Sequence, residues 1–252
     1  MIALDIERVS KYFYIRDKDK KKTLFSSFKK KIVLDNCSLK VNEGSIFGLV
    51  GLNGIGKTTL IKIIFDMLTQ NSGSVKFFGI DNYSSKSREN ICYLPEKFMP
   101  SQYLTGYEFL SISLSFFKKK LDKQKAKEVA LELDLDPECL QNVIGKYSKG
   151  MGQKLGLLLC LLSEAKLLVL DEPMTGLDPK SRIALKKALK EYAKNGNSIF
   201  FSSHILSDVE EICDHIAVLH NGKTLFNGVP KDFIEKYDEK TLEMTFLKCI
   251  SS

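Results

Sequence analysis

The chain has 252 residues, 44% of them hydrophobic, and a formal net charge of +7 at pH 7. This length suits one large domain or one domain with a sizeable insertion, and the hydrophobic content is enough for a buried core. The apolar runs are far shorter than the roughly 20 residues of a membrane-spanning helix, and the first ten residues lack the pattern of a signal peptide. We therefore expect a globular, cytoplasmic protein whose six scattered cysteines are reduced and bind no metal.

A strongly basic segment occupies residues 16–31. It holds eight cations and two aspartates, a local charge of +6. If the segment is helical, Leu24, Phe25 and Phe28 share one face, and the lysines beside them suit peripheral contact with an anionic membrane surface. Such runs are more often solvated, flexible insertions, and that alternative stays open. Nucleic-acid binding is not expected, because no recognisable reader module accompanies the basic residues.

A phosphate-binding loop follows the next apolar run. Residues 45–51 predict a strand and residues 57–68 predict a helix, and the intervening GLNGIGKTT matches the pattern G-x-x-x-x-G-K-[ST]. Glycines let consecutive N–H groups curl around phosphate oxygens, although an ordinary glycine turn is the alternative. Lys57 is predicted to reach the β- and γ-phosphates, and Thr58 to offer its hydroxyl to Mg²⁺. The predicted nucleotide-binding residues of this loop are Asn53, Gly54, Gly56, Lys57, Thr58 and Thr59.

A helical region extends from about Pro100 to Leu162. Thr105 and Glu108 form a capping-box signature there, so we expect a helical insertion within an α/β core. Towards its end, a glycine-bearing turn at Ser148 opens an amphipathic helix, and such turns present free N–H groups to an anion. The phosphate-binding loop lies far earlier in the sequence, so this second turn has no obvious ligand within its own segment.

Two adjacent carboxylates follow the apolar residues 167–170. A buried strand would deliver Asp171 to the carboxyl edge of the sheet, where it can hold the Mg²⁺ shell. Glu172 is predicted to orient or deprotonate the water that attacks the γ-phosphate. The alternative is a solvated acidic turn that caps the helix beginning near Pro179.

The remaining strands complete the expected sheet. Residues 91–94 and 198–201 are buried-strand candidates, and residues 216–226 predict two strands around an Asn-Gly hairpin. His204 follows one of these strands, before a helix that Ser207 and Glu210 would cap. An isolated histidine is most often structural, but at this edge we predict a hydrogen bond from His204 to the γ-phosphate. Strands that alternate with helices predict a mainly parallel, buried sheet.

Five motifs in this order resemble the nucleotide-binding subunit of ATP-binding cassette (ABC) transporters over essentially the whole chain: GLNGIGKTT, YSKGMGQ, LLVLDEP, TGLD and SSH. The resemblance implies a P-loop NTPase fold, with an α/β core around a mainly parallel sheet, an antiparallel β subdomain and a helical insertion subdomain. It places the core at residues 1–96 and 163–229, the helical subdomain at 97–162 and a C-terminal tail at 230–252. It implies ATP hydrolysis as the activity, with ATP and Mg²⁺ as cofactors.

The resemblance also implies a head-to-tail dimer with a second copy or with a homologous ATPase subunit. In that dimer Ser148 and Gly150 would grip the γ-phosphate of the ATP that the other copy holds, and Asp178 would touch the partner's site. Phe13 in VSKYFY is predicted to stack on adenine, with its two tyrosine neighbours as alternatives. Glu96 stands where many members have a glutamine; a carboxylate can still ligate Mg²⁺, but an ionised one donates no hydrogen bond to water.

A complete transporter would also need a transmembrane permease subunit, so the resemblance places this chain at the inner face of the cell membrane. Departures at Lys149 and Met151 resemble exporter-type cassettes that handle drugs, peptides or glycans. The groove beside Glu96 is a predicted docking surface for the permease, although its aromatic residues could instead join the insertion to the core. The apolar pattern of residues 242–247 could pack on the core or on a partner. The alternatives are a soluble ABC-type ATPase that acts on ribosomes or DNA, and a small-molecule phosphotransferase.

Overall fold

The computed structural model describes residues 1–16 and 28–251. The strands are β1 (Ile2–Arg16), β2 (Phe28–Asn42), β3 (Ile46–Val50), β4 (Ser72–Phe77), β5 (Ile80–Asp81), β6 (Ile91–Leu94), β7 (Leu167–Asp171), β8 (Ser198–Ser203), β9 (His215–His220) and β10 (Lys223–Gly228). The α-helices are α1 (Lys57–Ile64), α2 (Gly106–Ser115), α3 (Lys123–Glu132), α4 (Lys149–Ser163), α5 (Pro179–Lys194), α6 (Leu206–Ile212), α7 (Pro230–Tyr237) and α8 (Leu242–Ser251).

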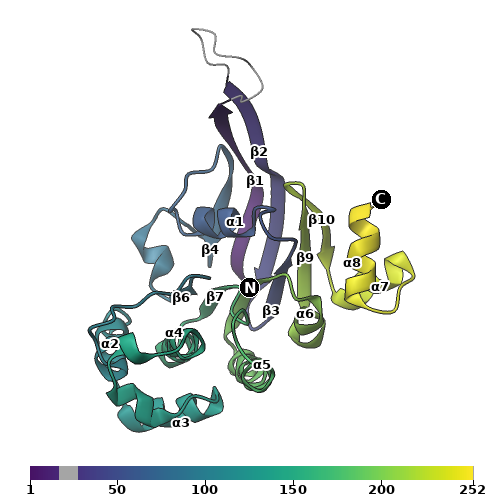
Figure 1. The fold of residues 1–252 in the computed structure, drawn as a ribbon. Helices are drawn as coiled ribbons and strands as arrows, with labels where there is room; N and C mark the ends of the chain where they lie inside the picture. Colours follow the sequence, from purple (N-terminus) through teal and green to yellow (C-terminus); the bar gives the residue numbers. More distant parts are fainter. Residues whose placement is uncertain (17–27, 252) are drawn as a thin grey trace.

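A six-stranded sheet lies at the centre of the molecule, in the order β10-β9-β3-β8-β7-β6 (Figure 1). The neighbouring pairs from β9 to β6 are parallel, and only the β10–β9 hairpin is antiparallel. Strands β3, β7 and β8 are buried along their whole length, as expected of parallel strands that are covered on both faces. The predicted α/β fold with a mainly parallel sheet is therefore confirmed.

The two faces of this sheet pack into separate apolar clusters. Leu168 and Leu170 of β7 face a cluster that includes side chains of α2, α4 and the two C-terminal helices. Leu167 and Val169 face a second cluster, made with α1 and the antiparallel sheet. Because alternate side chains of a strand point to opposite faces, each central strand contributes to both clusters. The carboxyl ends of the strands are thereby fixed between two packed layers.

The second sheet is antiparallel and has the order β2-β1-β4-β5. The outer ends of β1 and β2 pair from Tyr12↔Ile32 to Arg16↔Phe28 and project beyond the rest of the fold (Figure 1). Phe28 therefore begins a strand, so the prediction of a helical face through Phe28 is wrong, because long-range pairing with Arg16 sets its backbone. Leu24 and Phe25 lie outside the described residues.

The helical region between β6 and β7 consists of α2, α3 and α4, separated by turns rather than forming one continuous run. The predicted capping box is confirmed: the Thr105 hydroxyl accepts from the Glu108 N–H, and the Glu108 carboxylate accepts from the Thr105 N–H at 2.8 Å. The side chains of this region join the main apolar cluster, so the insertion packs against the core rather than forming a core of its own. Among residues 1–16 and 28–251, no helix has both the length and the apolar character to span a bilayer.

Two predictions near the C-terminus have different outcomes. The capping pair Ser207–Glu210 is wrong, because α6 begins at Leu206, and no side chain caps its first turn. The Ser203 hydroxyl instead accepts a hydrogen bond from the Ile205 N–H at 3.0 Å, and the Glu210 carboxylate accepts one from the Leu242 N–H at 3.0 Å. The apolar pattern of residues 242–247 packs mainly on the core: Leu242 and Phe246 are buried, and Leu247 is exposed. None of the six cysteines forms a disulfide in the structure, and all of them except Cys213 are buried.

Candidate functional site

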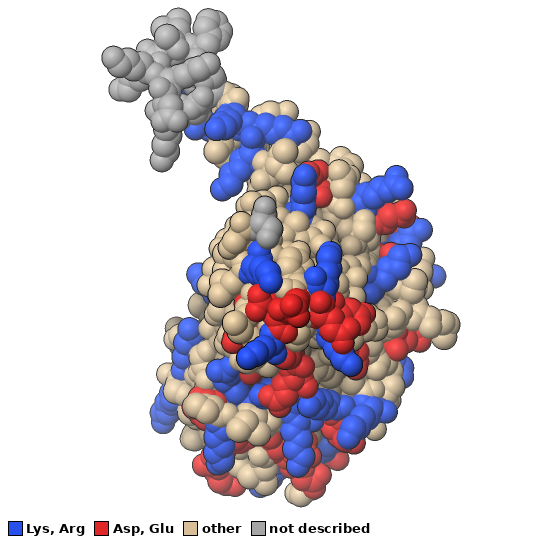
Figure 2. Space-filling model, turned by 90° about the vertical axis from the view of Figure 1, so that its right-hand side faces the viewer, with Lys and Arg blue, Asp and Glu red and all other residues tan. Residues whose placement is uncertain are grey.

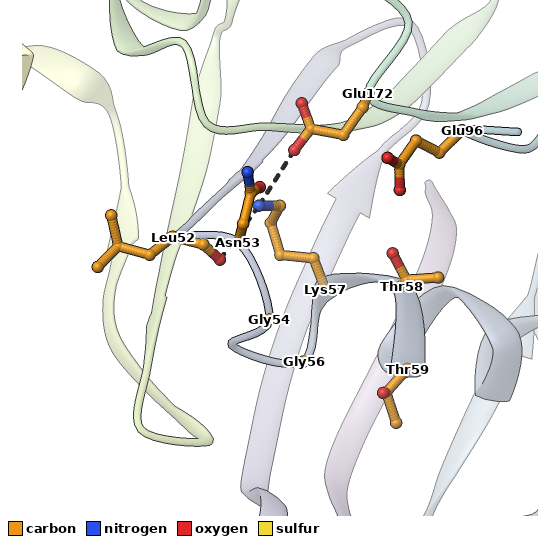
Figure 3. A pocket seen from close by; sticks show the side chains of 9 residues that line it. All are labelled: Leu52, Asn53, Gly54, Gly56, Lys57, Thr58, Thr59, Glu96 and Glu172. Carbon is orange, nitrogen blue, oxygen red and sulfur yellow. Dashed lines mark hydrogen bonds and ion pairs between the residues drawn. The ribbon is translucent and has the colours of Figure 1, made fainter. Parts of the chain in front are cut away.

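The glycine-rich loop between β3 and α1 frames a pocket of about 320 Å³ at the carboxyl edge of the parallel sheet (Figure 3). Gly56 has a φ of 120°, and a Cβ there would lie 3.0 Å from the Val33 carbonyl oxygen, so only glycine fits. Its neighbour Gly54 has a φ of 78°. The residues that line the pocket are Leu52, Asn53, Gly54, Gly56, Lys57, Thr58, Thr59, Glu96 and Glu172. The structure thus brings the predicted loop residues together with two predicted carboxylates.

Lys57 opens α1 and is buried beneath the pocket. Its Nζ donates to the Gly51 carbonyl oxygen at 2.6 Å and lies 3.1 Å from Glu172 Oε1 (Figure 3). Both partners of this ion pair are almost fully buried, so removal of either would leave a charge in a poorly solvated place. The lysine is therefore held in position at the floor of the pocket, with the free N–H groups of the loop and of the helix start around it.

Asp171 ends β7 and is buried next to Thr58, one of the residues that line the pocket. Its Oδ2 accepts from the Thr58 hydroxyl at 3.1 Å, and its Oδ1 accepts from the Ser202 hydroxyl at 2.5 Å. Burial raises the pKa of Asp171, and the charges of Glu96 and Glu172 add to the increase, while the two hydroxyl hydrogen bonds oppose it. A buried carboxylate among other carboxylates is stabilised by a cation.

These donors fit Mg²⁺. The Asp171 carboxylate, the Thr58 hydroxyl and the Glu96 carboxylate offer the hard oxygen ligands that Mg²⁺ prefers, and Glu96 lies on the Thr58 side of the pocket (Figure 3). Within the described part of the chain, no group of three or more His, Cys, Asp or Glu side chains could hold a metal by itself. The site therefore suits a metal that keeps water ligands and shares phosphate oxygens, rather than a fully protein-bound ion.

Glu172 adopts a backbone conformation that is unusual for a residue with a Cβ, with a φ of 51°. Such a conformation costs about 1–2 kcal/mol and persists only where the surroundings impose it. Here the Glu172 N–H donates to Ser202 Oγ at 3.0 Å, and Glu172 Oε2 lies 2.7 Å from His204 Nδ1. Its Oε1 is buried and makes no hydrogen bond apart from the ion pair with Lys57. Glu172 is thus directed into the pocket, and His204, which lines no part of the pocket itself, supports it.

Ser202 is a functional residue that the sequence analysis missed. It is fully buried and links the two carboxylate positions, since its hydroxyl donates to Asp171 and accepts from the Glu172 N–H. Ser202 is the direct register partner of Asp171 across the parallel pair β7–β8. The available signal was a small polar residue at the end of an otherwise apolar strand, but the register that places it beside Asp171 is a tertiary property.

Four predicted residues lie apart from the pocket of their own chain. Ser148 is exposed and caps α4 by accepting from the Met151 N–H at 3.2 Å, with Gly150 in the first turn of that helix. Asp178 is exposed and caps α5 by accepting from the Ser181 N–H at 3.0 Å. Phe13 lies on the projecting part of β1, with Lys11 Nζ 5.0 Å from its ring centre. None of the four is among the lining residues.

A second cluster that the sequence analysis missed connects α4 to the start of α5. The Asp134 carboxylate lies 3.2 Å from Lys154 Nζ and 2.5 Å from Lys180 Nζ. The buried Ser181 hydroxyl contacts both Asp134 Oδ2 (3.0 Å) and Asp178 Oδ2 (2.6 Å). The Lys180 side chain first, and then the Ser181 and Lys154 side chains, lower the pKa of Asp134 to about 2. Asp134 therefore ties the helical region to the turn that carries Asp178.

Comparison with known proteins gives one consistent result. The family model described as "ABC transporter" matches residues 34–175. An uncharacterized ABC transporter ATP-binding protein from Nostoc sp. is 36% identical over 210 residues, which cover 82% of this chain and 63% of that protein. The bacitracin transport ATP-binding protein of Bacillus licheniformis is 35% identical over 215 residues, which cover 83% of this chain and 69% of that protein. The chain thus spans about three fifths of the length of the Nostoc relative.

The fold comparison agrees with the sequence comparison. A solved structure titled as the ATP binding subunit of an ABC transporter superposes with a TM-score of 0.82 at 26% identity, and covers 98% of this chain and 99% of that one. These similarities confirm the family resemblance and the P-loop NTPase fold class that the motifs predict.

Proposed function

The chain belongs to the ABC transporter family, and from this premise we propose that it binds and hydrolyses ATP with Mg²⁺ at the pocket of its glycine-rich loop. The observation that carries the proposal is the convergence of five side chains on one edge of the sheet. They are Lys57, Thr58, Asp171, Glu172 and His204. A merely structural glycine turn would not need a buried lysine facing a strained, buried glutamate.

Each side chain has a distinct task in this proposal. Lys57 and the loop N–H groups bind the phosphates, while Thr58 and Asp171 hold Mg²⁺, which supplies charge neutralisation when it is bound. Glu172, directed into the pocket by His204, orients the attacking water and accepts its proton. The resting ion pair of Lys57 with Glu172 must then loosen, because phosphate oxygens compete for the lysine while the glutamate turns to water.

The completed site requires a second molecule. Ser148 and Gly150 begin α4 away from the pocket of their own chain, and the exposed helix start offers N–H groups to an anion. We assign these groups to the γ-phosphate of a nucleotide held by a second copy or by a homologous ATPase subunit, with Asp178 at the same interface. A two-fold arrangement uses one interface to make two equivalent sites. Loss of the γ-phosphate removes the contacts that favour the closed dimer.

We propose that the closing and opening of the dimer drive a transmembrane permease subunit. The described residues contain no helix that could span a bilayer, and we place the chain at the inner face of the cell membrane through its partner. The relative named for bacitracin transport supports an exporter, with a drug, a peptide or a glycan as cargo. Met99 and Tyr103, which follow Glu96 in the sequence, are exposed and suit contact with the partner. Copurification with a multi-spanning membrane protein supports this assignment, whereas cosedimentation with ribosomes or DNA supports the soluble alternative.

The substitution Glu172→Gln tests the chemical step. Glutamine keeps the size of the side chain but cannot accept the proton of the attacking water. We expect the variant to bind Mg-ATP at least as tightly as the wild type, because Lys57 loses its competing partner, and to lose at least about 100-fold in steady turnover, as expected when a general base is removed. Wild-type turnover by this variant contradicts the assigned role, and loss of ATP binding contradicts the assigned site.

A further inference from the structure

Apart from the predicted adenine contact at Phe13, or at one of its two tyrosine neighbours, the outer part of the β1–β2 ribbon has no assigned task in the ATP site. We define the outer ribbon as residues 12–16 and 28–32, which pair directly from Tyr12↔Ile32 to Arg16↔Phe28. Strand β4 pairs with β1 no further than Ser10, so the outer ribbon extends past the sheet that anchors it. Figure 1 shows it projecting from the body, away from α2–α5. It is thus accessible from both faces.

The charge of the outer ribbon has a single sign. It carries four cations, Arg16, Lys29, Lys30 and Lys31, and no acidic residue. None of these four forms an ion pair among the described residues. Figure 2 shows Lys and Arg side chains gathered at the neck of the projection. Such a patch attracts an anionic surface and is repelled by a cationic one.

Large apolar side chains accompany these cations. Directly opposed residues of an antiparallel pair point to the same face, and the face alternates along each strand. Tyr14, Phe28 and Ile32 therefore share one face with Arg16 and Lys30. These three apolar residues are 65%, 65% and 55% exposed. The opposite face carries Phe13, the predicted adenine contact, whereas this face carries Tyr14, one of the two alternatives to it.

We propose that the outer ribbon binds the anionic surface of a lipid bilayer, with the side chains of Tyr14, Phe28 and Ile32 inserted at headgroup depth. Lipid phosphates attract the cations, and the boundary between headgroups and acyl chains accepts the aromatic and aliphatic side chains. The long lysine side chains can follow the apolar surface and keep their ammonium groups at the phosphates. Single-stranded nucleic acid also attracts cations and stacks on aromatic rings, but Ile32 offers no stacking surface. The mixture of exposed aliphatic and aromatic residues therefore favours lipid.

The charge component is tested by cosedimentation of the full chain with vesicles. One set contains phosphatidylcholine with a quarter phosphatidylglycerol, and the other contains phosphatidylcholine alone. We expect binding to the anionic set only, and a fall in affinity as salt is added. Replacing Lys29, Lys30 and Lys31 together by Gln should lower the partition constant at least about fivefold, the contribution of one cation at the lipid-facing side of the ribbon. Lys30 lies on that side, and Lys29 and Lys31 lie on the opposite side, where screening weakens their share. The matched control replaces Lys187, Lys190 and Lys194 of α5 by Gln and should leave binding unchanged.

Insertion of the apolar face is tested by fluorescence. The chain has no tryptophan, so Tyr14→Trp introduces a single reporter, and Leu247→Trp on the exposed face of α8 is its control. We expect anionic vesicles to shift the emission of the Tyr14→Trp variant to shorter wavelength and brominated lipids to quench it, with no change in the control. Equal loss of binding in both lysine triples, or a Tyr14→Trp reporter that stays in water, overturns the proposal. Tighter binding of a single-stranded oligonucleotide through the same lysines also overturns it, in favour of nucleic acid.

Discussion

Replacement of Ser202 by Ala tests whether the two carboxylate positions are held by one hydroxyl. In the native protein this hydroxyl donates to the buried Asp171 carboxylate at 2.5 Å and accepts from the Glu172 N–H at 3.0 Å. A hydrogen bond to a charged group contributes about 1.5–3 kcal/mol, and an unsatisfied buried N–H costs about 1–3 kcal/mol. Because the two losses share one atom and the site can partly relax, we expect a destabilisation of about 2–4 kcal/mol.

The matched control is Ser198→Ala on the same strand. Ser198 is also buried, but its hydroxyl only accepts the Gly44 N–H at 3.0 Å, so we expect a loss of about 1 kcal/mol. Free energies of unfolding from urea denaturation, measured without nucleotide or metal, compare the two variants. Turnover as a function of Mg²⁺ concentration gives a second measurement. Without Ser202 the pKa of Asp171 should rise further, so Ser202→Ala should need more Mg²⁺ for half-maximal turnover and Ser198→Ala should not. Equal stabilities and equal Mg²⁺ requirements in the two variants refute the reasoning.

Two further predictions concern other parts of the fold. Gly56→Ala should abolish ATP binding and destabilise the chain by about 1–3 kcal/mol, because it combines a positive φ with a Cβ close to the Val33 carbonyl oxygen. The control is Gly44→Ala, where φ is also positive but the space around the Cβ is open; it should lower the free energy of unfolding by about 1 kcal/mol and leave ATP binding intact. Calorimetry measures ATP binding by both variants. Asp134→Asn should destabilise the chain at neutral pH. Since the pKa of Asp134 in the folded state is lowered to about 2 from an ordinary 3.8, its contribution to stability is present above pH 4 and is lost as the pH falls towards 2. The difference in unfolding free energy between wild type and variant, measured by urea denaturation, should therefore shrink over that range. A difference that grows on acidification contradicts the assigned ion pairs.

The sequence predicted those parts of the site that depend on local chemistry. The glycine pattern before Lys57 and the carboxylates after an apolar strand require only short-range geometry. The structure brings the loop and Glu172 to one pocket, and Asp171 to the Thr58 hydroxyl. The capping box at Thr105 is local in the same sense. The strand register that brings Ser202 beside Asp171 joins segments 31 residues apart, and no short pattern reports it.

The errors have the same physical origin. Phe28 fits a helical face by spacing, but cross-strand pairing with Arg16 decides its conformation. Ser207 and Glu210 match a capping box, yet Ser203 takes the free N–H group at that turn and Glu210 binds the start of α8. In both places tertiary contacts override a valid local preference. The strained φ of Glu172 could not be predicted from the sequence either, because the surrounding hydrogen bonds impose it.

The central claim is that each nucleotide site is completed by a second molecule, and mixing two inactive variants tests it most directly. Lys57→Ala disables the phosphate loop and Ser148→Ala disables the turn assigned to the partner's nucleotide, so each variant alone should lack turnover. In a mixed dimer one site pairs the intact loop of one chain with the intact turn of the other. An equal mixture should therefore recover about a quarter of wild-type turnover, since half of the dimers are mixed and each has one intact site of two. If each chain completes its own site, no mixture regains activity, and the account is contradicted.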